Sequence, residues 1–186
     1  PDQFGISIVT VDGQVYQKGD FNEDFSIQSM CKPFNYCFAL EELGLDEVHK
    51  HVGQEPSGRK FNDLTLLLRS SEGFQNNSTN IPFNPMINAG AIMTSGLINS
   101  YETYENRFNF IKNEFAKLIG WTAKGKFDSK FPRFNKDVAR EENFTGFNNM
   151  AIGYLLMATG NLPNKENKHK KKVNQKHDNF DFYNEP

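Results

Sequence analysis

The sequence of 186 residues lacks several features that would define a class of protein. It has no apolar run near the roughly 20 residues that a membrane-spanning helix needs, so no membrane partner is expected. Its 21 basic and 23 acidic residues nearly cancel, which argues against binding to nucleic acid. Its only two cysteines, Cys31 and Cys37, lie on one predicted helix and face different ways, so no disulfide is expected between them. This favours an intracellular, reducing compartment, either the cytoplasm or the mitochondrion.

The composition supports a folded domain followed by a polar segment. Eighteen phenylalanines provide apolar material for a core, and the length allows one domain or part of a larger one. We expect residues 1–163 to form the N-terminal part of a domain. Residues 164–179 are rich in lysine and asparagine and should be disordered, because they cannot bury enough apolar surface. The aromatic residues 180–186 either rejoin the domain or form a chance tail.

The first 20 residues predict a β-hairpin. Two β-branched runs, residues 4–11 and 14–20, flank the pair Asp12-Gly13. A two-residue Asp-Gly turn places both residues at positive φ and is a strong hairpin signal. An isolated hairpin is marginally stable, so these strands should rest on a larger sheet or on helices.

Helical patterns follow the hairpin. Residues 28–44 predict a helix with Ser29 as N-cap, Pro33 in the first turn and Gly44 at the end. A short helix should begin at Asp46 and end at Gly53. Small residues within 81–100 predict a tightly packed helix, and an apolar stripe predicts another over 104–120. After a basic loop, small and apolar residues predict a last helix over 144–160. The stripe comprises Phe108, Ile111, Phe115, Leu118 and Ile119.

The string "SMCK" places Ser29 three residues before Lys32. One helical turn brings such residues together, and a lysine of lowered pKa can take the proton of a serine nucleophile. The helix N-terminus adds N–H groups where negative charge would develop on a substrate. Ser-x-x-Lys is common by chance, however, and a capping serine beside a solvated lysine explains the same residues.

Longer strings of sequence distinguish the catalytic interpretation of Ser29 and Lys32 from the capping interpretation. The strings "FSIQSMCKPF", "VGQEPSGRKFN", "NPMINAGAI" and "EENFTGFNNMAIGYLL" occur in this order. Together they resemble the glutaminase family, serine-dependent amidohydrolases related in fold to β-lactamases and penicillin-binding proteins. The resemblance covers residues 4–163, with gaps at 69–82 and 121–140. It implies an α+β fold of the β-lactamase/transpeptidase type, in which this chain supplies the N-terminal hairpin and the helical part.

The resemblance also implies roles for individual residues. Ser29 would attack the side-chain amide of L-glutamine, and Lys32 would take its proton, without metal or cofactor. Gln28, Asn88, Glu142 and Asn149 would line the substrate pocket, with Glu141 as an alternative to Glu142. The histidines do not suggest a metal pair, because His49 and His51 are two apart and would point away from each other on a helix.

Two features depart from the family pattern. The family carries a pocket tyrosine in an aromatic string, and Tyr183 in "FDFY" follows later than expected, so it is either that residue or part of a chance tail. The family's later sheet strands, with a second tyrosine and an oxyanion-hole amide, are missing. We therefore expect a fragment of low activity from a parent that hydrolyses glutamine in glutamine catabolism.

Other functions stay open at this point. The family is commonly tetrameric, so a homo-oligomer is expected. A truncated chain could instead be non-catalytic and pair with full-length subunits. A penicillin-recognising serine acyltransferase on the same fold is a further alternative, which the asparagine and glutamate residues suited to a free amino acid argue against.

Overall fold

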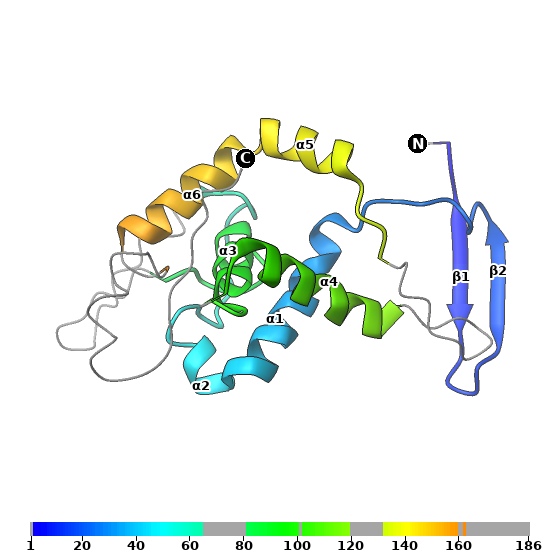
Figure 1. Cartoon of the computed structure of the whole chain (residues 1–186), viewed down its shortest axis with the longest axis horizontal. Helices are drawn as coiled ribbons and strands as arrows, with labels where there is room; N and C mark the ends of the chain where they lie inside the picture. Colours follow the sequence, from blue (N-terminus) through cyan, green and yellow to red (C-terminus); the bar gives the residue numbers. More distant parts are fainter. Residues whose placement is uncertain (1, 65–80, 101, 120–131, 160–161, 163–186) are drawn as a thin grey trace.

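The computed structural model describes residues 2–64, 81–100, 102–119, 132–159 and 162. Figure 1 shows a β-hairpin at one end of the molecule and a group of helices at the other, joined by an extended segment. None of the described helices is long and apolar enough to cross a membrane. The predicted polar segment 164–179 and Tyr183 lie outside the described residues.

The hairpin forms where the sequence predicted it. Strands β1 (Gly5–Val9) and β2 (Val15–Gly19) pair antiparallel, with Val9 opposite Val15. The predicted two-residue turn is wrong, however. Five residues, 10–14, separate the two strands; Gly13 N donates a hydrogen bond of 2.9 Å to Thr10 O, and Gly13 alone in this loop has positive φ, at +86°. A longer loop reverses the chain with a single left-handed residue, which glycine adopts without strain.

Both strands are exposed along their whole length. Ile8 and Tyr16, which lie opposite each other, are 54% and 59% exposed. Among the described residues the sheet has two strands, so the larger sheet expected beneath the hairpin is not seen there. The hairpin therefore contributes little to the core.

Helix α1 (Cys31–Leu43) follows a 3₁₀ turn, η1 (Gln28–Met30). The predicted capping role of Ser29 is wrong, because the N-cap is Met30 and no side chain caps the helix. Ser29 instead lies inside the 3₁₀ turn, with its side chain exposed. Gly44 ends α1 as predicted, with φ at +81°.

The next helix is shorter than predicted. Helix α2 (Leu45–Val48) begins after Gly44, with Asp46 inside its first turn rather than at its N-cap. The chain leaves the helix at His49, whose side chain hydrogen bonds to Tyr36 of α1 through Nε2 (2.8 Å) and to the Val52 carbonyl through Nδ1 (2.9 Å). Because a carbonyl only accepts, Nδ1 carries the proton and Nε2 accepts from the tyrosine hydroxyl in the neutral ring.

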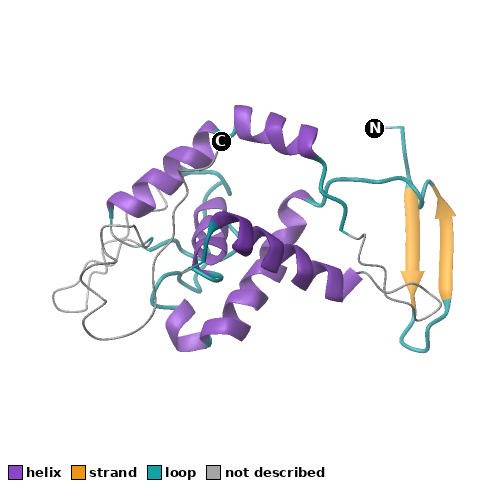
Figure 2. Cartoon of the chain, in the orientation of Figure 1, coloured by secondary structure: helices purple, strands orange, loops and turns teal. Residues whose placement is uncertain are grey.

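Helix α3 (Asn88–Leu97) runs through the centre of the helical group, where Figure 2 shows it surrounded by other helices. Its small residues allow close packing, as the sequence indicated. A Cβ atom on Gly90 would lie 1.8 Å from the Asn84 carbonyl oxygen, and one on Gly96 would lie 2.6 Å from Leu162. Polar contacts add to this packing, since Asn35 Nδ2 of α1 donates to Ser95 Oγ of α3 at 3.0 Å.

The remaining helices differ in part from the prediction. Helix α4 (Tyr104–Ile119) matches the predicted range, and Phe115 is buried, but Leu118 and Ile119 at its end are about half exposed rather than in the core. A helix that the sequence reading missed, α5 (Lys136–Thr145), replaces part of the predicted loop. Its signal was Asn135, whose side chain accepts from the amides of Asp137 and Val138 as an N-cap.

Helix α6 (Phe147–Ala158) lies within the range 144–160 predicted for one helix, but it begins after Gly146, and residues 144 and 145 belong to α5. Helix α6 packs on α3, and α1 packs on α3, α2 and α4. The Phe115 ring meets Phe34 and Phe38 of α1 edge to face, with centroids 5.7 and 5.3 Å apart. The core consists of Phe38, Ala39, Val48, Val52, Ile87, Ala89, Met93, Leu97, Ile98, Phe115, Ile152, Leu156 and Leu162.

Arg107 of α4 holds the C-terminal end of α3. Its Nε donates to the Ile98 carbonyl (2.9 Å), and its Nη2 donates to the carbonyls of Ser95 (2.8 Å) and Gly96 (3.1 Å). Burial lowers the pKa of Arg107 to about 9, partly offset by the carboxylate of Glu42. A cation at this end also suits the negative end of the helix dipole.

The tight packing of α3 predicts opposite effects for two glycine substitutions. Gly90→Ala should lower the free energy of unfolding by about 1–3 kcal/mol or more, because its new methyl group meets the Asn84 backbone. Gly153→Ala in α6 meets nothing within 4 Å and should raise it by about 0.5–1 kcal/mol, because alanine favours the helix. Urea denaturation of both variants measures the difference. Equal effects of the two substitutions would contradict this packing.

Candidate active site

The site begins at η1, where Gln28 and Ser29 lie next to each other. Gln28 has φ at +43°, a left-handed conformation that is uncommon for residues other than glycine. Ser29 is exposed, so its hydroxyl is open to a ligand. Strained backbone conformations of this kind are found most often at functional sites.

Lys32 lies in the first turn of α1 and is partly buried. Its Nζ donates a hydrogen bond of 2.7 Å to Asn88 Oδ1, at the start of α3. The same Nζ lies 5.6 Å from the centroid of the Phe61 ring. Among the described residues Ser29 makes no hydrogen bond to Lys32, so the lysine is directed toward the asparagine. The structure thus brings Lys32 and Asn88 together, 56 residues apart in sequence.

Asn88 links the lysine to α6. While its Oδ1 accepts from Lys32, its Nδ2 donates to Asn149 Oδ1 at 2.9 Å. An asparagine amide can donate and accept at once, and this one does both. Lys32, Asn88 and Asn149 therefore form one hydrogen-bonded chain across α1, α3 and α6.

A second link joins η1 to α5. Gln28 Nε2 donates to Glu142 Oε1 at 2.9 Å, across 114 residues of sequence. Of the two adjacent glutamates, Glu142 makes this contact, whereas Glu141 accepts a hydrogen bond from the Thr145 hydroxyl through its backbone carbonyl. The predicted site residues thus form two hydrogen-bonded groups, Lys32 with Asn88 and Asn149, and Gln28 with Glu142, whose members Gln28 and Lys32 lie on either side of Ser29 in the sequence.

Burial shifts the pKa values of Lys32 and of its neighbour in the sequence, Cys31. Burial lowers the pKa of the Lys32 ammonium, an effect partly opposed by the nearby Cys31 thiolate. Burial raises the pKa of the Cys31 thiol, partly opposed by Lys32. At neutral pH a larger fraction of Lys32 is therefore the neutral amine than for an exposed lysine. A neutral amine is the form that can accept a proton.

Sequence reasoning missed the contribution of Phe61. Its backbone carbonyl accepts from Asn88 N at 2.9 Å, and its ring faces the Lys32 ammonium. Phe61 stands within the string "VGQEPSGRKFN", so the signal was present, but a phenylalanine in a turn segment does not by itself indicate a lysine contact. Tyr183 lies outside the described residues, and its role stays a prediction. Within the described ranges, no group of three or more His, Cys, Asp or Glu side chains could hold a metal ion.

Comparisons with known proteins identify the family of this chain. The family model described as Glutaminase matches residues 1–176. The chain is 41% identical over 160 residues to a glutaminase of Trichormus variabilis, covering 86% of this chain and 42% of that protein. It is 38% identical over 156 residues to the mitochondrial liver isoform of Rattus norvegicus glutaminase, covering 84% of this chain and 23% of that protein.

Solved structures with a similar fold are also glutaminases. The crystal structure of a Bacillus glutaminase superimposes with a TM-score of 0.69 at 32% identity, covering 86% of this chain and 48% of that one. The chain thus has the α+β, β-lactamase-like fold class that the sequence predicted. With the family model matching nearly all of its residues, it belongs to the glutaminase family. It spans between about a quarter and a half of the length of these relatives.

The burial of Lys32 predicts a measurable difference between lysines. The Cε signal of Lys32 should titrate at lower pH than that of an ordinary lysine, because burial lowers its pKa. Lys50 should titrate at higher pH, because the Glu47 carboxylate raises its pKa. Nuclear magnetic resonance of protein with ¹³C-labelled lysine measures both values, with Lys32→Arg and Lys50→Arg variants to assign the signals. A Lys32 midpoint at or above that of Lys50 would contradict the described environment.

Proposed function

We propose that the protein carrying this chain is a glutaminase, which hydrolyses the side-chain amide of L-glutamine to L-glutamate and ammonia. The observation that carries the proposal is the hydrogen-bonded chain of Lys32, Asn88 and Asn149, whose lysine follows the exposed Ser29 by three residues. This chain combines a lysine of lowered pKa with two amides, and in the proposal Ser29 supplies the hydroxyl that acts as nucleophile. Membership of the glutaminase family supports the choice of substrate.

The proposed reaction has two steps. Ser29 Oγ attacks the amide carbon while Lys32 Nζ takes the hydroxyl proton. The carbon–nitrogen bond then breaks, the proton passes from Lys32 to the leaving nitrogen, and ammonia departs, leaving a γ-glutamyl ester on Ser29. A water molecule hydrolyses the ester to give glutamate and free Ser29. No metal or cofactor takes part in this scheme.

The polar residues around Ser29 suit a free amino acid. The Glu142 carboxylate can bind the α-ammonium group by charge-assisted hydrogen bonds, and Gln28 Nε2 already holds that carboxylate at 2.9 Å. Asn88 and Asn149 can bind the carboxylate or amide oxygens through their Nδ2 groups. In the proposal Tyr183 completes this pocket.

The proposal also includes the cellular location and the oligomeric state of the enzyme. An intracellular location, in the cytoplasm or the mitochondrion, is supported by a relative named as mitochondrial and by two free cysteines. Assembly into a homo-oligomer, a tetramer as in the family, rests on the family resemblance.

The proposal predicts where a reactive glutamine analogue will attach. Purified protein treated with 6-diazo-5-oxo-L-norleucine should gain one adduct on Ser29, detected by peptide mass spectrometry. Lys32→Met should slow the labelling by about 10²–10⁴-fold, because the proton acceptor is lost. Ser29→Ala should abolish it.

The control variant is Ser26→Ala, which removes an exposed serine of the same segment outside the proposed site and should label at the wild-type rate. An adduct on another residue, or none on Ser29, would overturn the proposed nucleophile. Labelling of Ser29 by a fluorescent penicillin, with none by the glutamine analogue, would instead favour a penicillin-recognising acyltransferase. Ammonia release from glutamine measures turnover in the same samples.

A further inference from the structure

The start of α3, where Asn88 lies, is not defined by its own sequence. The N-cap of α3 is Ile87, and no side chain of that residue can accept a hydrogen bond from the first turn. Isoleucine is among the poorest N-cap residues, because a helix start needs acceptors for its free N–H groups. Another part of the molecule must therefore fix where this helix begins.

Asn84 supplies that acceptor. Its Oδ1 accepts from the backbone amides of Met86 (3.0 Å) and Ile87 (3.2 Å), directly before the helix. The next amide, that of Asn88, donates to the Phe61 carbonyl at 2.9 Å. Three successive N–H groups at the helix entrance are thus satisfied from outside the helix.

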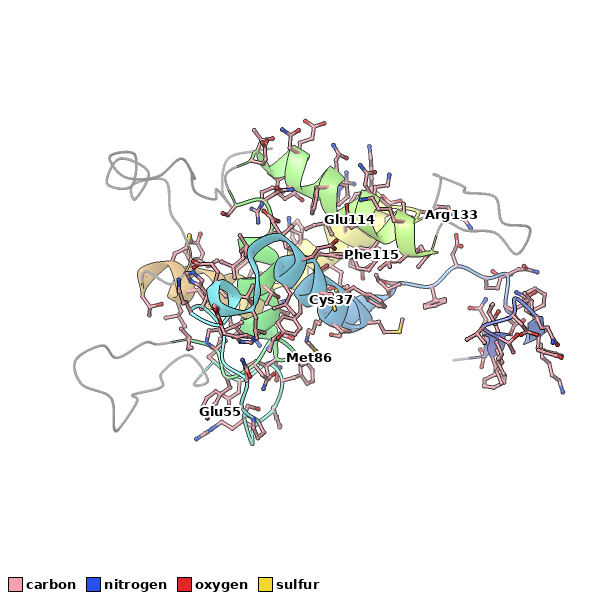
Figure 3. The ribbon with its side chains drawn as sticks, turned by 90° about the horizontal axis from the view of Figure 1, so that it is seen from below. Cys37, Glu55, Met86, Glu114, Phe115 and Arg133 are labelled. Atoms are coloured by element: carbon pink, nitrogen blue, oxygen red, sulfur yellow. The ribbon has the colours of Figure 1, made fainter. Side chains whose placement is uncertain are left out.

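The other end of the Asn84 amide holds a second segment of the chain. Asn84 Nδ2 donates to the Glu55 carbonyl at 2.8 Å. Two backbone bonds join the same segments, from Gly53 N to Pro82 O (2.8 Å) and from Glu55 N to Phe83 O (2.9 Å). Figure 3, in which Glu55 and Met86 are labelled, shows these segments side by side.

The backbone of Asn84 is held as firmly as its side chain. A Cβ atom on Gly90 would lie 1.8 Å from Asn84 O, 2.7 Å from Asn84 C and 3.0 Å from the Pro85 Cα atom. Backbone therefore packs directly on the first turn of α3, two residues after Asn88. Asn84 cannot move without moving the start of the helix.

We infer that Asn84 is a positioning residue of the active site. Its side chain bridges the 53–55 segment and the entrance of α3, and so sets where Asn88 presents its amide to Lys32. Asn84 acts through Asn88 and does not touch a substrate. The inference rests on the proposed function only in assigning a chemical role to the Lys32–Asn88 pair.

A double-mutant cycle tests whether Asn84 acts through Asn88. Asn84→Ala should slow the labelling of Ser29 by 6-diazo-5-oxo-L-norleucine about tenfold, the effect of losing a well-placed hydrogen bond. Asn84→Ser keeps a short acceptor for the Met86 and Ile87 amides and should fall between wild type and Asn84→Ala. In an Asn88→Ala background, Asn84→Ala should change the rate by less than about twofold, since the side chain it positions is already absent. Equal losses in both backgrounds would overturn the inference.

Amide hydrogen exchange provides a readout that does not need activity. Asn84→Ala should accelerate exchange of the Asn88, Gly53 and Glu55 amides by about tenfold, while amides in the middle of α4 change by less than about twofold. The control Asn106→Ala removes an exposed amide that donates to Glu102, and should leave both the labelling and these exchange rates unchanged.

The two readouts separate the two hypotheses. If wild-type protein is not labelled but Asn84→Ala selectively accelerates exchange at Asn88, the proposed function fails and the positioning of Asn88 stands. If exchange at Asn88 is unchanged, or rises equally throughout the molecule, the positioning role is wrong whatever the labelling shows.

Discussion

The hydrogen bond from Lys32 Nζ to Asn88 Oδ1 is the contact on which the candidate site depends. It joins the first turns of α1 and α3, and through Asn149 it extends to α6. Because the lysine is partly buried, losing its partner would leave a polar group poorly solvated, which costs more than the bond itself contributes. The pair therefore constrains how the three helices can start relative to one another. Ser29 lies immediately before this junction, in the turn that leads into α1.

The packing that brings these helix starts together is apolar and close. Helix α3 lies between α1 and α6, and Gly90 and Gly96 allow backbone and side chains to approach where a methyl group would collide. Arg107 fixes the far end of α3 by binding three of its last carbonyls, while Asn84 and Phe61 satisfy amides at its near end. Both ends of the central helix are thus held by groups outside it. A helix of ten residues would be marginal alone, so these contacts and its buried face account for its order.

The polar groups that suit a substrate are paired with each other in this structure. Gln28 donates to Glu142, and Asn88 donates to Asn149, so a bound amino acid would exchange these bonds for its own. Such an exchange leaves the number of hydrogen bonds similar and makes recognition depend on geometry and charge. The left-handed backbone of Gln28 adds a strained element directly beside the proposed nucleophile. The substrate pocket would therefore be built on a segment whose conformation the surrounding structure has to hold.

The sequence by itself determined the β-hairpin, the end of α1 at Gly44, the range of α4, the close packing of α3 and the family, because these depend on local periodicity, glycine positions and long characteristic strings. It did not determine that Ser29 lies in a 3₁₀ turn rather than at a cap, or that the hairpin loop has one left-handed residue. Helix α5 was not predicted, because its N-cap residue Asn135 lies in a basic, phenylalanine-rich stretch that was interpreted as a loop. Only the tertiary structure decided that Lys32 turns to Asn88, that Glu142 rather than Glu141 meets Gln28, and that Asn84 and Phe61 hold the start of α3. These contacts join residues 27 to 114 positions apart, and their geometry follows from how the helices pack, which no local pattern encodes.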